Sequence, residues 1–132
     1  MKINGILNRE INEVLGKLGH TQKICIADCG LPIPKEVNVV DLSLKIGQPS
    51  FIDVLEVINN EMKIEKAYVA NEIVENNIEI FKKSCDILNE NINVEFICHE
   101  DLKKLCNETL LIIRTGEATP YANIILESGV IF

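Results

Sequence analysis

Short apolar runs alternate with amphipathic segments along most of this sequence, and this alternation constrains the fold more than any other feature. The apolar runs predict strands, and the segments between them repeat apolar residues with the spacing of one helix face. Strands that alternate with helices indicate an α/β fold with a mostly parallel sheet. We therefore expect a single domain, residues 1–132, built as a three-layer α/β/α sandwich.

The expected elements follow from this pattern. Strands are expected at 23–27, within 37–44, at 67–70, 94–98 and 109–113, and within the tail 121–132. Helices are expected at 8–18, 51–62, 76–90 and 101–106. In the third of these helices the spacing predicts that Phe81, Cys85 and Leu88 face the core.

Charge and hydropathy exclude several classes of partner. The chain has 13 basic and 20 acidic residues, a net charge of -7 and no basic stripe, so we expect no nucleic-acid partner. Arg9, Glu10 and Glu13 stand where a signal peptide needs an apolar core, and no aliphatic run is long enough to span a membrane. We expect a cytoplasmic protein that does not associate with membranes.

The five cysteines form no disulfide or metal-binding pattern. Their number is odd, no Cys-x-x-Cys occurs, and most lie in apolar surroundings, which is typical of small core residues. Cys98 and His99 are adjacent, but neighbouring strand residues point to opposite faces of a sheet, so the two are poor joint ligands. We expect no metal site.

Two polar residues flank the expected strand 23–27. His20 follows the helix 8–18, and Asp28 stands where the strand ends. Ligands bind outside the carboxyl ends of strands in open α/β sheets, so a histidine and a carboxylate brought there would form an acid/base pair. Spacing alone favours a plainer interpretation, in which His20 helps to cap the helix and Asp28 begins a turn.

Several polar segments follow strands and are expected to converge at one end of the sheet: Asp28, His99 and the loop 116–123. The sequence has no GxGxxG, no Walker-type GK[ST] and no GxSxG, which disfavours nucleotide cofactors and serine hydrolysis. The only two histidines of the chain remain as candidates, because the histidine side chain in general can both take and give protons near neutral pH. They suit proton transfer on a small polar molecule.

Asn8 and the longer stretches 18–21, 27–34, 47–51 and 114–126 resemble the D-ribose pyranase family, to which the fucose mutarotase family is related. The resemblance extends over the whole chain. It implies an enzyme that interconverts the pyranose and furanose rings of D-ribose, without cofactor or metal, and supports ribose catabolism through ribokinase. By position, His20 resembles the proton donor of the family. The positions that resemble its sugar-binding residues are Asp28, His99, Tyr121, Ala122 and Asn123.

The chemistry of ring interconversion suits these residue types. Ring opening removes a proton from the anomeric hydroxyl and supplies one to the ring oxygen, so general acid and base groups suffice. Asp28 could either orient His20 or bind a sugar hydroxyl, and the sequence leaves both open. Tyr121 and Asn123 offer a hydroxyl and an amide for sugar hydroxyls, or they only shape the loop after Pro120.

The resemblance also implies a ring-based homo-oligomer, a pentamer or decamer, with sites near subunit contacts. The apolar ending 129–132 must be covered by the chain's own core or by a neighbour. In a shared site, the segment 121–123 is expected to reach the His20 of the neighbouring subunit.

Three other functions stay open. One is a mutarotase for another monosaccharide such as L-fucose, although the run 30–34 resembles the ribose branch more closely. Another is a sugar-binding module without catalysis. A sugar-phosphate isomerase is disfavoured because the chain has no phosphate cradle. Arg114 and Glu117 are expected to make structural contacts at a strand end rather than to bind substrate.

Overall fold

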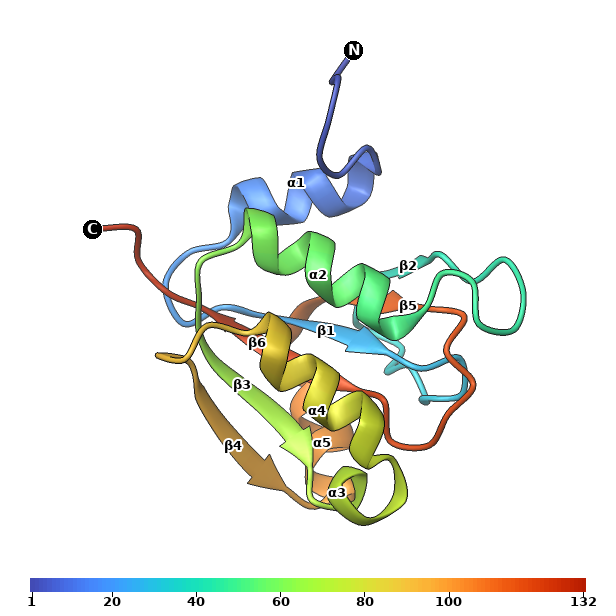
Figure 1. Ribbon diagram of the computed structural model, residues 1–132. Helices are drawn as coiled ribbons and strands as arrows, with labels where there is room; N and C mark the ends of the chain where they lie inside the picture. Colours follow the sequence, from blue (N-terminus) through green and yellow to red (C-terminus); the bar gives the residue numbers. More distant parts are fainter.

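The computed structural model describes residues 1–132 and contains one six-stranded sheet with helices on both faces (Figure 1). The strands are β1 (Lys23–Ala27), β2 (Val39–Asp41), β3 (Ile64–Ala70), β4 (Asn93–Ile97), β5 (Thr109–Arg114) and β6 (Ile124–Ser128). They lie in the order β2-β5-β1-β6-β3-β4. Strand β6 is antiparallel to both its neighbours, β1 and β3, while the other pairings are parallel. All strands except β6 therefore end at the same end of the sheet, which we call its carboxyl end.

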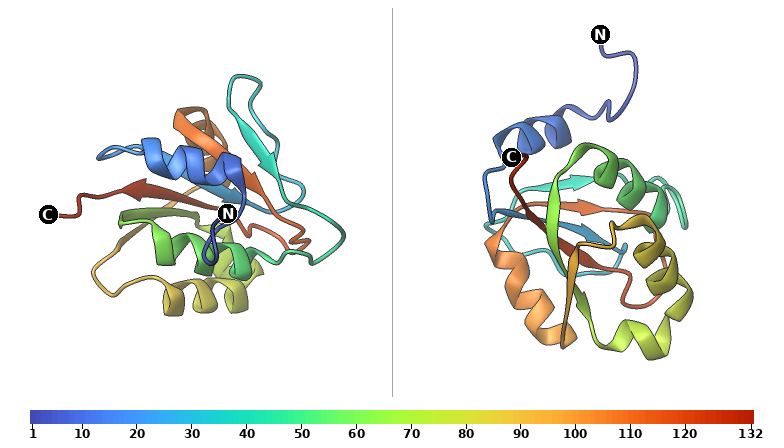
Figure 2. Two further views of the ribbon diagram at one scale, coloured as in Figure 1. Left: turned by 90° about the horizontal axis from the view of Figure 1, so that it is seen from above. Right: turned by 60° about the vertical axis from the view of Figure 1, so that its left-hand side comes forward.

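The helices form a layer on each face of this sheet. Helices α1 (Arg9–Lys17), α2 (Phe51–Glu61) and α4 (Ile78–Ile87) cover one face, and the short α3 (Glu72–Asn76) follows β3. Figure 2 shows α2 and α4 on one side of the sheet and α5 (His99–Leu105), which continues into the 3-10 turn η1 (Cys106–Glu108), on the other. This arrangement confirms the expected α/β/α layers. None of the helices combines the length and the apolarity that crossing a bilayer requires.

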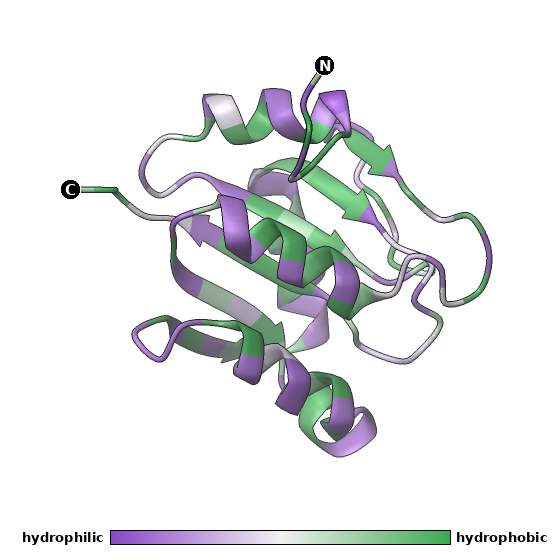
Figure 3. Ribbon diagram, turned by 45° about the horizontal axis from the view of Figure 1, so that its top comes forward, coloured by the Kyte–Doolittle hydropathy of each residue, from purple (hydrophilic) through white to green (hydrophobic).

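Alternating residues of β1 supply both halves of the core. Ile24 and Ile26 pack under α1 and α2, whereas Cys25 and Ala27 face α5. Figure 3 shows apolar residues concentrated along the central strands, while the helices carry hydrophilic residues as well. Since both faces of β1 are buried, it reads in the sequence as a continuous apolar run.

The expected helix 76–90 is interrupted. Asn77 leaves the helical conformation, with φ -155° and ψ 53°, and separates α3 from α4. Its side chain donates hydrogen bonds to the Thr119 hydroxyl and to the Pro120 carbonyl, both at 2.9 Å. This contact with a distant loop, which no local spacing reveals, ends one helix and begins the next.

The prediction that Cys85 faces the core is wrong, because Ser84 occupies the buried side of α4 and Cys85 is exposed. Ser84 lies three residues after Phe81 and four before Leu88, so these three share one face. The Ser84 hydroxyl donates to the Ile80 carbonyl at 2.7 Å. That bond satisfies the hydroxyl and allows a polar residue to be buried.

Gly116 stands where two backbone segments meet. Its carbonyl accepts a hydrogen bond from Gly47 N–H at 2.6 Å, and its own N–H donates to the Pro49 carbonyl at 2.9 Å. A Cβ atom at this position would lie within 3.0 Å of backbone atoms of Lys45 and Gln48. Only glycine fits this close approach, which fixes the start of the loop leading to β6.

Replacing Gly116 by alanine should therefore lower the free energy of unfolding by about 1–3 kcal/mol, because the added methyl group must displace backbone. Urea denaturation followed by circular dichroism measures the change. Gly16→Ala is the matched control, since nothing lies within 4 Å of the added atom and Gly16 is helical. The control should gain roughly 0.5–1 kcal/mol. Equal stability of the Gly116→Ala and wild-type proteins would contradict the conclusion that only glycine fits at this position.

Candidate active site

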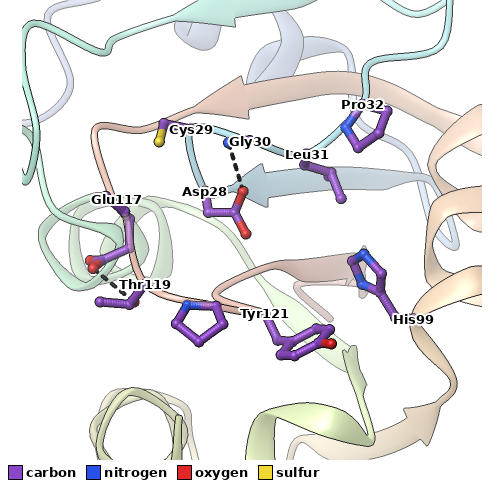
Figure 4. Close-up of a pocket in the computed structure, with 11 residues that line it drawn as sticks. Asp28, Cys29, Gly30, Leu31, Pro32, His99, Glu117, Thr119 and Tyr121 are labelled. Atoms are coloured by element: carbon purple, nitrogen blue, oxygen red, sulfur yellow. Dashed lines mark hydrogen bonds between the residues drawn. The ribbon is translucent and has the colours of Figure 1, made fainter. Parts of the chain in front are cut away.

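A hollow of about 500 Å³ opens at the carboxyl end of the sheet. That volume lies within the usual range of small-molecule sites. Three segments line it: the turn after β1, the first residue of α5, and the loop before β6 (Figure 4). The lining residues are Asp28, Cys29, Gly30, Leu31, Pro32, His99, Glu117, Ala118, Thr119, Pro120 and Tyr121. The predicted convergence at one end of the sheet is confirmed for Asp28, His99 and residues 117–121 of the loop.

Asp28 is held by a reciprocal pair of hydrogen bonds with Asn123. The Asp28 N–H donates to Asn123 Oδ1, and Asn123 Nδ2 donates to Asp28 Oδ2, both at 2.9 Å. The second carboxylate oxygen, Oδ1, accepts from Gly30 N–H at 2.8 Å, so Asp28 does begin a turn. Each oxygen keeps lone pairs for a further donor, such as a hydroxyl group in the hollow.

Asn123 and Ala122 are fully buried and do not line the hollow of a single chain. Ala122 packs in the main core, and the Asn123 amide is occupied by Asp28. The amide therefore fixes the position of the carboxylate. Direct sugar contact by these two residues stays a prediction.

His99 and Tyr121 form the aromatic side of the hollow. Their rings are 5.1 Å apart at 85°, an edge-to-face contact. The backbone N–H of His99 donates to the Glu72 carboxylate at 3.0 Å, which ties the start of α5 to α3. His99 Nδ1 is buried without a hydrogen-bond partner, and Tyr121 has a φ of 58°. Unsatisfied buried groups and left-handed backbone at non-glycine residues are typical of functional sites.

Glu117 is a pocket residue that the sequence placed only as a structural contact. It is buried, and its carboxylate accepts hydrogen bonds from Phe51 N–H at 3.1 Å and from the Thr119 hydroxyl at 2.9 Å. Phe51 is the first residue of α2, so the carboxylate lies where the helix dipole favours negative charge. The bonds hold the loop 117–121 against α2. The sequence could have indicated the contact between Glu117 and Thr119, which are two residues apart. It could not have indicated the contact with Phe51, which is 66 residues away.

Arg114 makes the structural contacts expected of it. Its Nη2 and Nε donate to the Cys29 carbonyl at 2.6 and 3.0 Å, and its Nη1 lies 2.7 Å from Asp41 Oδ2. Hydrogen bonds from Ser43, and then from Arg114, hold the pKa of Asp41 below its usual value. The guanidinium thus braces the turn after β1 and stays outside the hollow.

His20 lies at the opposite end of the sheet from Asp28. It precedes β1, whereas Asp28 follows it, and a strand of five residues spans about 16 Å. The expectation that both reach one end is wrong for a single chain, because β1 separates them. Nor does His20 cap α1, whose C-cap is Leu18. Its ring instead lies 3.0 Å from Glu65 Oε1, a partner 45 residues away that no sequence spacing indicates.

No group of three or more His, Cys, Asp or Glu side chains is arranged to hold a metal ion. The hollow instead combines carboxylates, an imidazole and a phenol, without Lys or Arg in its lining. Such a set can bind hydroxyl groups and move protons on an uncharged ligand.

Comparison with known proteins matches residues 1–131 to the RbsD / FucU transport protein family. A D-ribose pyranase of Bacillus cytotoxicus is 54% identical over 132 residues, which is 100% of both chains. The structure of Bacillus subtilis RbsD complexed with D-ribose has a TM-score of 0.96 at 47% identity and covers 100% of both chains. The fucose mutarotase of Streptococcus pneumoniae in complex with L-fucose shares the fold, with a TM-score of 0.78 at 19% identity over 96% of this chain and 95% of that one.

Replacing Asn123 by alanine should remove both hydrogen bonds to Asp28 and leave the backbone N–H of Asp28 without an acceptor. We expect the free energy of unfolding to fall by about 1–3 kcal/mol, measured by urea denaturation. Asn107→Ala is the control, because this exposed amide donates only to the Lys104 carbonyl at 3.0 Å. It should change stability by less than about 0.5 kcal/mol. Similar losses of stability in both variants would show that the two hydrogen bonds between Asn123 and Asp28 stabilise the fold no more than an exposed hydrogen bond does.

Proposed function

Because the chain belongs to the RbsD / FucU transport protein family, we propose that it is a D-ribose pyranase. It interconverts the pyranose and furanose forms of D-ribose and is thus a sugar isomerase. The observation that carries this proposal is the hollow where Asp28, His99 and Tyr121 meet, in a chain similar over its full length to a ribose-bound relative.

The reaction needs one proton removed and one supplied. In ring opening, the anomeric O–H loses its proton, the carbonyl forms, and the bond from the anomeric carbon to the ring oxygen breaks. The ring oxygen takes up a proton and becomes a hydroxyl. Attack by a different hydroxyl on the carbonyl then closes the other ring, with the proton transfers reversed, so no net charge is created and acid/base groups suffice.

We assign the proton donor to His20 and sugar binding to the residues of the hollow. Asp28, fixed by Asn123 and Gly30, offers carboxylate oxygens to a sugar hydroxyl. His99 and Tyr121 offer an imidazole and a phenol from the facing side. Asn123 contributes by holding Asp28.

We propose that a second copy of the chain completes the site. His20 lies too far from the hollow of its own chain, yet its side chain is 51% exposed and free to face a neighbour. Large apolar residues also project into solvent, among them Leu44, Ile46, Ile131 and Phe132. Surfaces of this kind mark protein–protein contacts. A ring-based homo-oligomer, a pentamer or decamer, would bring the His20 of one subunit to the hollow of the next.

We also place the protein in the cytoplasm. All five cysteines are free thiols, including the buried Cys25 and Cys106, whose sulfur atoms lie 4.0 Å apart. Thiols in this state are typical of a reducing compartment.

Ring interconversion can be measured directly by NMR exchange spectroscopy on equilibrated D-ribose. Adding the protein should accelerate exchange between pyranose and furanose signals, and His20→Ala should lose roughly 10²–10⁴ of that acceleration while still binding ribose. L-Fucose in the same assay tests the mutarotase alternative. Unchanged exchange with ribose bound would favour a non-catalytic binding module, and a fully active His20→Ala protein would move the acid/base role elsewhere.

The shared site can be tested by complementation between His20→Ala and Asp28→Asn subunits. Each variant alone should be nearly inactive. After unfolding, mixing in equal amounts and refolding together, about one quarter of the sites should combine an intact His20 with an intact Asp28. Activity should rise toward that fraction of wild type. Mixed assemblies that demonstrably form and stay inactive would place both residues in a site within one chain.

A further inference from the structure

We propose that Glu65 is a positioning residue that holds the His20 imidazole in one orientation and leaves Nδ1 as the nitrogen that exchanges a proton with the sugar. The inference rests on the proposed role of His20 as proton donor. In the proposed assembly, His20 and Glu65 of one subunit would together face the hollow of the next subunit.

The contact between the two side chains determines which nitrogen is free. His20 Nε2 lies 3.0 Å from Glu65 Oε1 and 3.1 Å from Oε2. An ionised carboxylate can only accept hydrogen bonds, so Nε2 must carry a hydrogen atom to make this contact. The proton that His20 gives or takes during ring opening is then the one on Nδ1.

Both members of the pair lie next to backbone that contacts the end of β6. Glu65 is the second residue of β3 and lies at an irregularity in the pairing with β6, between Ile64, which pairs with Ser128, and Lys66, which pairs with Glu127. His20 precedes Thr21, whose N–H donates to the Ser128 carbonyl at 2.8 Å and whose φ is 68°. Branched residues rarely adopt this left-handed conformation. The turn is thus held in one shape next to the histidine by the end of β6.

Gly129 leaves the space that Glu65 occupies. A Cβ atom at position 129 would lie 3.0 Å from Glu65 Cβ and 3.1 Å from Glu65 Oε2. The Gly129 N–H donates to the Lys63 carbonyl at 2.9 Å, so the glycine cannot easily move aside. The absence of a side chain at position 129 therefore leaves room for the Glu65 carboxylate beside His20.

No other charged group competes for the ring. A second cavity, at the amino end of the sheet, is lined by His20, Glu61 and Lys63 among others, but neither Glu61 nor Lys63 bonds to His20. Glu61 instead accepts the Ile6 N–H at 2.7 Å and lies 3.9 Å from the Lys2 ammonium. Asp28, the other candidate to orient His20, lies at the opposite end of β1 in the same chain, about 16 Å away. Glu65 thus takes the orienting role and leaves Asp28 to the sugar.

An exposed contact between two polar side chains can also be without consequence, so the test must separate orientation from general structure. We use a double-mutant cycle read by ribose exchange. Glu65→Ala should lower kcat roughly 10- to 100-fold with little change in KM, because a loosened imidazole misaligns the transfer. In the His20→Ala background the same substitution should have no further effect, since a group that acts only through His20 has nothing left to orient.

Two further variants sharpen the cycle. Glu65→Gln keeps an acceptor oxygen and should retain more activity than Glu65→Ala, and it serves in the cycle if the alanine variant does not fold. Glu56→Ala removes the same charge from an exposed position on α2 and should leave kcat unchanged. In nitrogen-15 spectra, the hydrogen-bonded Nε2–H of His20 should be visible in wild type and lost in Glu65→Ala.

The outcomes distinguish this inference from the proposed function. An inactive His20→Ala protein with a fully active Glu65→Ala protein would keep the acid/base role of His20 and overturn the role of Glu65. An equal loss from Glu65→Ala in the wild-type and His20→Ala backgrounds would make Glu65 merely structural. A fully active His20→Ala protein would overturn both, because Glu65 would have no catalytic group to position.

Discussion

The reciprocal hydrogen bonds between Asp28 and Asn123 join the end of β1 to the start of β6, and the site depends on them. The two residues are 95 positions apart and meet because β6 runs antiparallel beside β1. A strand of opposite direction must begin where its neighbours end. The loop before β6 is therefore delivered to the carboxyl end of the sheet, beside the turn after β1, and the hollow forms between them.

This geometry explains which parts of the site the sequence could predict. Residues that follow parallel strands share one end of a sheet, so the meeting of Asp28, His99 and the loop 116–123 followed from strand order alone. His20 precedes its strand, and treating it as a partner of Asp28 ignored strand direction. The Glu65 contact and the helix break at Asn77 depend on tertiary partners 45 and 42 residues away. Local patterns carry no information about such pairs, whereas they located every strand to within a few residues.

The charges around the hollow fit an uncharged ligand. Asp28 and Glu117 line it, and their carboxylates are satisfied by amides, backbone N–H groups and a hydroxyl rather than by cations. Arg114, the nearby cation, is bound to Asp41 and to the Cys29 carbonyl. A phosphate group would meet negative charge with no counter-ion, which argues against a sugar-phosphate substrate. The many hydroxyls of a free sugar match the acceptors that remain.

The proposed proton donor, His20, and the proposed binding residues lie at opposite ends of one sheet, so the proposed activity would require the assembly that we propose. In the single chain the His20 and Glu65 side chains are 51% and 40% exposed, so water weakens their interaction. A neighbour that covered them would exclude this water and strengthen the contact, because a hydrogen bond is stronger in a less polar environment. The orientation of the imidazole would then be enforced only where a hollow lies opposite it. Assembly would thus create the site and also order the group that does the chemistry.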